Sequence, residues 1–307
     1  MASPTLPHSF NRVAVLGSGV MGSAIACHLA QTGHEVLLLD LPAKEGPRIA
    51  TADGFLKACI KSKPSPLYRK AFASRITTGN FEDDMPRIAD CDWIIEVVVE
   101  RLDIKKIVFA QVEKHRKPGT PITSNTSGIP IGDLAEGRSE DFQACLCGTH
   151  FFNPPRYLAL LEIIPHAGSD AALIAHFMAY GRDRLGKTTV LCKDTPAFIA
   201  NRVGVFAIQA LFHTVKDMGL SIEAVDKLTG PAMGRPKSAT FRTCDVVGLD
   251  TLVHVANGVK DNCPDDERKA VFETPDYVQH LVDNGHLGSK SGQGFYKKTK
   301  VDGKKAI

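Results

Sequence analysis

Several features that mark particular classes of protein are missing from this sequence of 307 residues. Its first ten residues, MASPTLPHSF, contain no long apolar stretch of the kind that an export signal carries. No later segment reaches the roughly 18 uninterrupted apolar residues that a membrane-spanning helix needs. We therefore expect a protein without an export signal or a membrane span, located in the cytoplasm.

Strong charge and clustered cysteines are missing as well. The formal net charge is only +3, which is too mild to indicate nucleic acid as the main partner. The eight cysteines are scattered, and the close pair Cys145 and Cys147 does not recur as a set of metal ligands. We expect reduced thiols in an intracellular protein and no metal site. A composition of 43% hydrophobic and 23% charged residues suits a globular chain of one large or two ordinary domains.

The clearest pattern present lies in the first forty residues. A short apolar run, RVAVLG at 12–17, predicts a buried strand, and VMGSAIACHLAQT has helical spacing and stops at Gly33. A second buried strand, HEVLLLD, ends at Asp40. The junction between the first strand and the helix reads GSGVMG, a GxGxxG, and Asp40 follows its last glycine after 18 residues. This context predicts a dinucleotide-binding site.

Each residue of this loop has its own physical reason. Gly17 permits the tight turn, Gly19 lets the pyrophosphate approach the backbone, and Gly22 lets the helix pack closely on the strand. The N–H groups at the start of the helix face the phosphates. Asp40 accepts hydrogen bonds from the ribose and repels a 2′-phosphate, so we expect NAD rather than NADP, although Lys44 nearby weakens the argument. The predicted cofactor-binding residues of this region are Gly17, Gly19, Val20, Met21, Gly22 and Asp40.

After Asp40 the chain is predicted to be helical and basic. Between residues 55 and 80 there are six Lys or Arg residues and no acid. They form either a solvated helix face or a landing site for a polyanionic ligand tail, with Lys57, Lys61 and Lys70 as candidate contacts. Further on, CDWIIEVVVE at 91–100 and TPITSN at 120–125 read as strands. Strands that alternate with helices predict a mostly parallel, doubly wound α/β sheet of the Rossmann type.

The character of the chain changes after Val190. The segment DTP, at 194–196, predicts the start of a helix, with proline at its first position, that runs to Gly219. From there to about Gly285 the chain reads as helices. We place a domain boundary near Lys193, so that residues 1–193 form a Rossmann-type NAD-binding domain and residues 194–307 an all-α C-terminal domain.

Two ionisable residues stand in apolar runs that flank a proline-rich break. The stretch 148–165 reads GTHFFNPPRYLALLEIIP, with His150 in the first run and Glu162 in the second. Burying an unpaired carboxylate costs several kcal/mol. If the chain reverses midway between them, the runs become antiparallel strands and the two side chains lie opposite each other. This predicts either a general-base dyad or a structural pair in the core.

These motifs together resemble the L-3-hydroxyacyl-CoA dehydrogenases of fatty-acid β-oxidation. The resemblance covers nearly the whole chain, from the Gly17 loop to SGQGFY at 291–296. Its most specific segments are SNTSGIPI, GTHFFNPP, LLEII, KDTPAFIANR and VVGLD. Three segments are similar to the dehydrogenase part of multifunctional enzymes that also carry an enoyl-CoA hydratase: EVVVERLDIKK, SNTSGIPI and GRPKSATFRT.

The resemblance implies a role for individual residues. It places the catalytic histidine at His150, its partner glutamate at Glu162, and two further active-site residues at Ser127 and Asn201. The NAD contacts that it implies are Glu100, Lys105, Ser127, Asn153 and Lys290. It also implies an acyl-CoA substrate, a homodimer formed through the C-terminal helical domain, and an enoyl-CoA hydratase fused in a longer chain. The basic segment AMGRPKSATFRT departs from the family pattern, so the resemblance does not imply which acyl-chain length this chain prefers.

The sequence therefore predicts NAD-dependent oxidation of L-3-hydroxyacyl-CoA to 3-oxoacyl-CoA. Two alternatives stay open. One is a dehydrogenase of a free hydroxy acid or sugar acid, and the other is a crystallin-like structural protein that binds NAD. The presence of His150, Glu162, Ser127 and Asn201 together argues against a purely structural role.

Overall fold

The computed structural model of the chain describes residues 6, 9–297, 299–301 and 304–306. Within these residues the chain divides into two compact units, Met1–Thr195 and Pro196–Ile307. The first unit contains an eight-stranded sheet with the strand order β3-β2-β1-β4-β5-β6-β7-β8. Neighbouring strands are parallel except for β6 and β7, which are antiparallel. This confirms the prediction of a doubly wound, Rossmann-type sheet.

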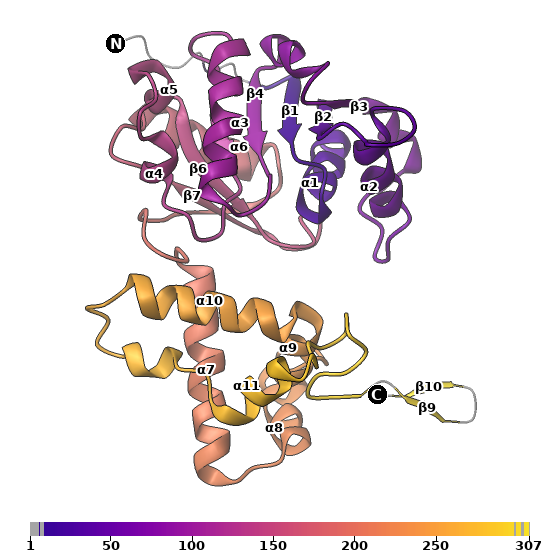
Figure 1. Cartoon of the computed structure of the whole chain (residues 1–307), viewed down its shortest axis with the longest axis vertical. Helices are drawn as coiled ribbons and strands as arrows, with labels where there is room; N and C mark the ends of the chain where they lie inside the picture. The colour runs from indigo at the N-terminus through magenta and orange to yellow at the C-terminus, as the bar shows by residue number, and fades with distance from the viewer. Residues whose placement is uncertain (1–5, 7–8, 298, 302–303, 307) are drawn as a thin grey trace. The chain divides into compact units, whose positions relative to one another are not determined.

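Helices and strands alternate through most of the first unit (Figure 1). The strands are β1 (Arg12–Leu16), β2 (Glu35–Asp40), β3 (Ile76–Asn80), β4 (Trp93–Glu96), β5 (Ile122–Ser124), β6 (Leu146–Phe151), β7 (Leu160–Ile164) and β8 (Thr188–Leu191). The α-helices are α1 (Val20–Gln31), α2 (Ala50–Ile60), α3 (Leu102–His115), α4 (Ile131–Ala135), α5 (Glu140–Ala144) and α6 (Ala171–Asp183), and the 3-10 helices are η1 (Lys70–Arg75) and η2 (Met85–Asp90).

Alternation along the strands assigns the two faces of the sheet. Val13 and Val15 of β1 and Cys147 of β6 belong to one buried cluster with side chains of α1 and α6. Gly148, the next residue of β6, points the other way: a Cβ there would lie 3.0 Å from Ile131 of α4. Because successive strand residues face opposite sides, α1 and α6 cover one face and α4 the other. Both faces are therefore buried, as a parallel sheet requires.

The second unit is helical. Its helices are α7 (Ala200–Met218), α8 (Ile222–Thr229), α9 (Phe241–Val247), α10 (Leu249–Asn262) and α11 (Asp276–Asp283), with 3-10 helices η3 (Pro231–Met233) and η4 (Lys269–Phe272). A small antiparallel pair, β9 (Thr299–Val301) and β10 (Lys304–Ala306), follows. The prediction of a helical C-terminal part is confirmed, with this small hairpin added to it.

The motif SGQGFY docks against a buried carboxylate within the second unit. Asp245, which is 1% exposed, accepts hydrogen bonds from the backbone N–H groups of Phe295 (2.8 Å) and Tyr296 (3.0 Å). A Cβ on Gly294 would lie 2.0 Å from Asp245 Oδ1. Only glycine allows this close approach, which explains the second glycine of the motif.

Three predicted elements differ from the structure. Residues 76–80 were expected in a helical region but form strand β3, because their β-branched side chains pair with β2. The strand expected over 91–100 ends at Glu96, whose side chain accepts a hydrogen bond from Val98 N as the chain leaves the sheet. The helix expected from Pro196 begins at Ala200, because Ala197 and Phe198 have φ values of 61° and 50°, which no right-handed helix contains.

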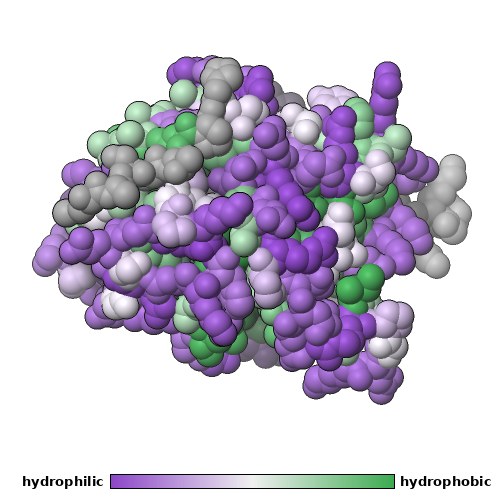
Figure 2. All heavy atoms as spheres, turned by 90° about the horizontal axis from the view of Figure 1, so that it is seen from above, coloured by the Kyte–Doolittle hydropathy of each residue, from purple (hydrophilic) through white to green (hydrophobic). Residues whose placement is uncertain are grey.

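Among the residues that the structure describes, the face of the molecule drawn in Figure 2 shows no large continuous apolar area. Hydrophilic residues dominate the face drawn in Figure 2, and hydrophobic residues occur there in scattered groups. In the part of the chain that the structure describes, no helix has both the length and the apolar character needed to cross a membrane.

Candidate active site

The glycine loop between β1 and α1 has the geometry that the sequence predicts. Gly17 has a φ of 105°, and a Cβ on it would lie 2.6 Å from Val97 O. A Cβ on Gly22 would lie 1.8 Å from Gly17 O, so the helix packs directly on the turn. A Cβ on Gly19 would meet nothing within 4 Å. The space next to Gly19 is where a pyrophosphate can approach the start of α1.

Asp40 is held in place at the end of β2. Its Oδ2 accepts hydrogen bonds from Ser18 N (2.6 Å) and Ser18 Oγ (2.5 Å), and its Oδ1 accepts one from Leu41 N (2.7 Å). The carboxylate is therefore oriented by the glycine loop itself. Ser18 is a contributor that the sequence analysis missed, although it stands inside the GxGxxG.

A cavity of about 660 Å³ lies at this edge of the sheet. Predicted cofactor residues line it: Gly17, Gly19, Val20, Met21 and Asp40. Its other walls are mostly apolar and include Leu41, Phe81, Ile104 and Ile107, which the sequence analysis did not single out. Such walls suit a flat aromatic ring beside a hydrogen-bonded ribose. The residues present therefore fit a dinucleotide.

The two ionisable residues of the hairpin meet as predicted. Strands β6 and β7 pair in a register that places His150 opposite Glu162. His150 Nδ1 lies 2.7 Å from Glu162 Oε2. The two residues are 5% and 0% exposed. A buried carboxylate at this distance orients the imidazole ring and selects the tautomer with a proton on Nδ1.

Contacts of Arg156 and Lys187 stabilise the connection between β6 and β7. Arg156 Nη1 donates to Ser65 O at 2.7 Å, and its guanidinium lies 3.9 Å from the centre of the Tyr68 ring. Lys187 Nζ donates to the carbonyl oxygens of Pro155 and Leu158, and burial lowers the pKa of Lys187 to about 8. These contacts fix the turn that brings the two strands together.

A second cavity, of about 380 Å³, lies beside this connection. Its walls include Gly19, Asn153 and Arg156 together with Lys63. Of the basic residues, Lys63 and Arg156 line this cavity, whereas the candidates Lys57, Lys61 and Lys70 line neither of the two cavities. Those three side chains are exposed, and Lys57 Nζ lies 3.4 Å from Asp53 Oδ2.

The loop that carries Ser127 is linked to the segment that follows β4 and to strand β6. Glu100 Oε1 accepts hydrogen bonds from Ser127 N (2.8 Å) and Ser127 Oγ (3.3 Å). Asn125 Oδ1 accepts one from Phe151 N (2.9 Å), next to His150 in β6. The structure thus brings Ser127, Glu100 and Lys105 into one network, in which Lys105 Nζ lies 3.2 Å from Glu100 Oε2.

Asn201 and Lys290 lie in the second unit. Because α7 begins at Ala200, Asn201 is its second residue, closer to the start of the helix than a helix beginning at Pro196 would place it. Lys290 Nζ donates to Asp250 Oδ2 at 2.6 Å, and this bond lowers the pKa of Asp250. Asp250 is the acid of VVGLD, and Lys290 directly precedes the motif SGQGFY.

Comparison with known proteins identifies the family. The NAD-binding domain of 3-hydroxyacyl-CoA dehydrogenase matches residues 12–195, and the C-terminal domain of 3-hydroxyacyl-CoA dehydrogenase matches residues 198–298. A probable 3-hydroxyacyl-CoA dehydrogenase of Bacillus subtilis is 50% identical over 302 residues, which cover 94% of this chain and 38% of that protein. A second one, of Deinococcus radiodurans, is 45% identical over 94% of this chain and 83% of that protein.

A solved structure agrees with these matches. The (S)-3-hydroxybutyryl-CoA dehydrogenase PaaH1 from Ralstonia eutropha superimposes with a TM-score of 0.78 at 26% identity, over 95% of this chain and all of that one. The matches to both family domains together cover most of the sequence. The chain therefore belongs to the 3-hydroxyacyl-CoA dehydrogenase family, a family of NAD-dependent oxidoreductases.

Proposed function

We propose that this chain oxidises L-3-hydroxyacyl-CoA to 3-oxoacyl-CoA in fatty-acid β-oxidation, with His150 and Glu162 as its general-base dyad. The observation that carries the proposal is the buried contact of 2.7 Å between His150 Nδ1 and Glu162 Oε2. A carboxylate placed in a fully buried strand position is costly unless it stabilises a positive charge next to it. Proton transfer from an alcohol creates such a charge on the imidazole.

The two nitrogens of the His150 ring have different roles in proton transfer. His150 Nδ1 holds its proton and donates it in the hydrogen bond to Glu162. Nε2 then carries the lone pair and accepts the proton of the C3 hydroxyl. Glu162 stabilises the imidazolium that results. When NAD is bound, it supplies the acceptor for the hydride that leaves C3.

Ser127 has the role of orienting the substrate. Glu100 accepts from the backbone N–H of Ser127 and from its hydroxyl, which fixes where the hydroxyl oxygen lies. Because the hydroxyl has a single proton, it donates to a substrate oxygen by turning away from Glu100, while the bond from the backbone N–H keeps the residue in place. A contact from Asn201 and cofactor contacts from Glu100, Asn153 and Lys290 stay predictions of the family resemblance.

The assembly of the protein is also a proposal. The Bacillus subtilis relative is much longer, since this chain spans 38% of it, which supports a longer protein. That the additional part is an enoyl-CoA hydratase stays a prediction of the family resemblance. The homodimer through the C-terminal helical domain, the domain boundary near Lys193 and the cytoplasmic location stay predictions.

Turnover of two related substrates tests the proposed function. With NADH, we expect acetoacetyl-CoA to be reduced with a kcat/KM at least about tenfold above that of free acetoacetate, because binding of the coenzyme A tail contributes to catalysis. Equal values would favour a dehydrogenase of free hydroxy acids. Normal NADH binding without turnover of either compound would favour the structural, crystallin-like role.

A further inference from the structure

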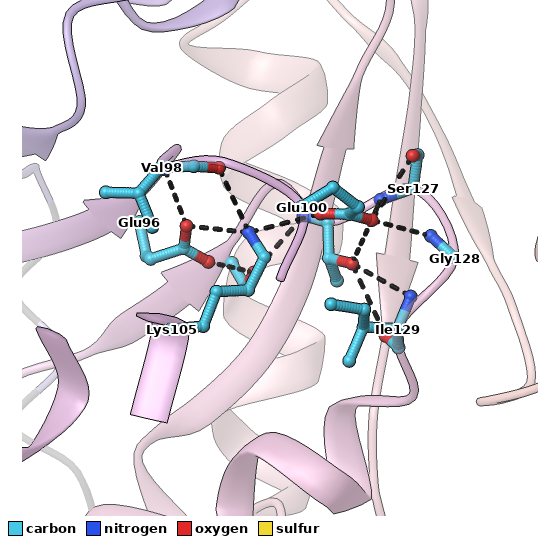
Figure 3. A network of polar contacts seen from close by, with 9 residues as sticks. Glu96, Val98, Glu100, Lys105, Ser127, Gly128 and Ile129 are labelled. Atoms are coloured by element: carbon cyan, nitrogen blue, oxygen red, sulfur yellow. Dashed lines mark hydrogen bonds and ion pairs between the residues drawn. The ribbon is translucent and has the colours of Figure 1, made fainter. Parts of the chain in front are cut away.

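A buried lysine joins two carboxylates where the chain leaves β4 (Figure 3). The side chain of Lys105 is 1% exposed. Its Nζ lies 2.7 Å from Glu96 Oε1, 3.2 Å from Glu100 Oε2 and 3.3 Å from Val98 O. An ammonium group has three N–H donors, and these three acceptors match them. Lys105 is therefore engaged within the protein and is almost inaccessible to a ligand.

Glu96 is the most deeply buried member of the group. It is 0% exposed, and its Oε1 accepts from Val98 N (2.6 Å) as well as from Lys105. Its Oε2 accepts from Ser124 Oγ at 2.5 Å, and Ser124 Oγ accepts from Thr126 N at 3.1 Å. Burial raises the pKa of Glu96, while Lys105 and the other donors oppose the rise. One side chain thus links the turn after β4 to the loop after β5.

Glu100 extends the network to that loop. Besides its bonds to Ser127, its Oε1 accepts from Thr126 Oγ1 (2.7 Å) and Gly128 N (3.1 Å). Burial raises the pKa of Glu100, but Lys105, Thr126 and Ser127 outweigh it, so that its pKa lies below the usual value. The ionised carboxylate gathers the loop amides around one oxygen, and Lys105 holds its other oxygen in place (Figure 3).

We propose that Glu96 is a positioning residue, which acts through Lys105 and Glu100 on the loop that carries Ser127. Lys105 then serves the cofactor side of the site through Glu100, and its direct contact with NAD stays a prediction of the family resemblance. The catalytic part of this inference rests on the proposed function. Without the charge of Glu96, the ammonium of Lys105 has Glu100 as its only charged partner in the network and draws it away from the loop amides.

Hydrogen exchange tests the structural coupling without reference to activity. Glu96→Gln keeps the size of the side chain but removes its charge, and the amides of residues 126–128 should exchange about tenfold faster or more, as expected for the loss of a charge-assisted hydrogen bond. Unchanged exchange would overturn the proposal. If Glu96→Gln does not fold, Lys105→Met and Glu96→Gln/Lys105→Met carry the test: because Glu96 acts through Lys105, both should exchange alike at residues 126–128, and faster exchange in the double variant would overturn the proposal.

Glu113→Gln is the matched control. Glu113 lies in α3, the helix that also carries Lys105. It pairs with an arginine (Arg138, 3.1 Å) and accepts hydrogen bonds from the N–H and hydroxyl of a loop serine, Ser139. It does not contact the loop that carries Ser127. Its removal should loosen residue 139 and leave the exchange of residues 126–128 unchanged.

A double-mutant cycle tests the catalytic part. We expect Glu96→Gln to lower kcat for 3-hydroxyacyl-CoA about tenfold, Glu113→Gln to change it less than about twofold, and Glu96→Gln/Ser127→Ala to be hardly worse than Ser127→Ala alone. Independent, multiplicative losses would refute action through Ser127. If the wild type does not turn over 3-hydroxyacyl-CoA, the proposed function fails, while the exchange experiment still decides whether Glu96 positions the loop.

Discussion

The stability of the first unit should fall with acidification because of His28, a buried residue of α1. The residue is 5% exposed, its Nε2 lies 3.1 Å from Leu185 O, and its Nδ1 lies 3.2 Å from Gln31 Nε2. The neutral ring with its proton on Nε2 satisfies both contacts: Nε2–H donates to Leu185 O, and Nδ1 accepts from the side-chain amide of Gln31. Burial, followed by the positive charge of Lys187, lowers the pKa of His28 to about 3.

The sign and size of this stability change follow from the difference between the pKa of His28 in the folded chain and its pKa in the unfolded chain. Below an ordinary pKa of about 6.5 the unfolded chain binds a proton at His28 that the folded chain does not, so the free energy of unfolding falls as pH falls. Between pH 7.5 and pH 5.5 the loss from His28 alone is about 1.4 kcal/mol. The pKa of His34 is also lowered by burial and adds to the loss in the same direction.

Urea unfolding followed by tryptophan fluorescence measures this loss. The sequence has a single tryptophan, Trp93, which is fully buried in the same unit. The variant His28→Gln keeps a donor for Leu185 O but cannot titrate, so its loss between the two pH values should be smaller by about 1.4 kcal/mol. An equal loss in the wild type and His28→Gln would show that the folded protein protonates His28 and refute the reasoning.

Two further predictions concern ligand choice. Ser18 and Leu41 hold Asp40 at the predicted ribose position, so kcat/KM with NAD should exceed kcat/KM with NADP by at least about tenfold, or about 1.4 kcal/mol. Asp40→Asn should reduce this ratio, and comparable values for the two cofactors in the wild type would contradict the prediction. If the exposed lysines hold the coenzyme A phosphates, replacing Lys57, Lys61 and Lys70 with alanine should raise KM for acyl-CoA and leave KM for NADH unchanged. The rise in KM should become smaller as the salt concentration increases. An unchanged KM for acyl-CoA at low salt would assign the three lysines to a solvated helix face.

The parts of the fold and site that depend on short-range patterns could be predicted from the sequence. Gly17 and Gly22 stand at a junction of strand and helix, where each spacing has a steric reason, and both contacts occur. His150 and Glu162 are equally distant from the turn between them, so antiparallel pairing alone brings them together. In each case a local pattern determines which residues meet.

The parts that depend on long-range contacts could not be predicted. Glu96, like Glu162, is an acid in an apolar run, but its partner Ser124 lies on a strand that follows only after helix α3, so no direct turn sets their register. Asn125 reaches Phe151 across the sheet, and no spacing in the sequence indicates that bond. The start of α7 was misplaced because the backbone of Ala197 adopts a conformation that side-chain patterns do not indicate.

The most direct test of the central claim is the kcat of His150→Gln for 3-hydroxyacyl-CoA, compared with Glu162→Gln and with the double variant. His150→Gln removes the base and should lower kcat by roughly 10² to 10⁴, and Glu162→Gln should lower it too, because an amide cannot stabilise the imidazolium. If the buried pair acts as one unit, the double variant should be little worse than His150→Gln alone, with NADH binding retained in all three. Near-normal turnover by His150→Gln would contradict the account and leave the pair with a structural role only.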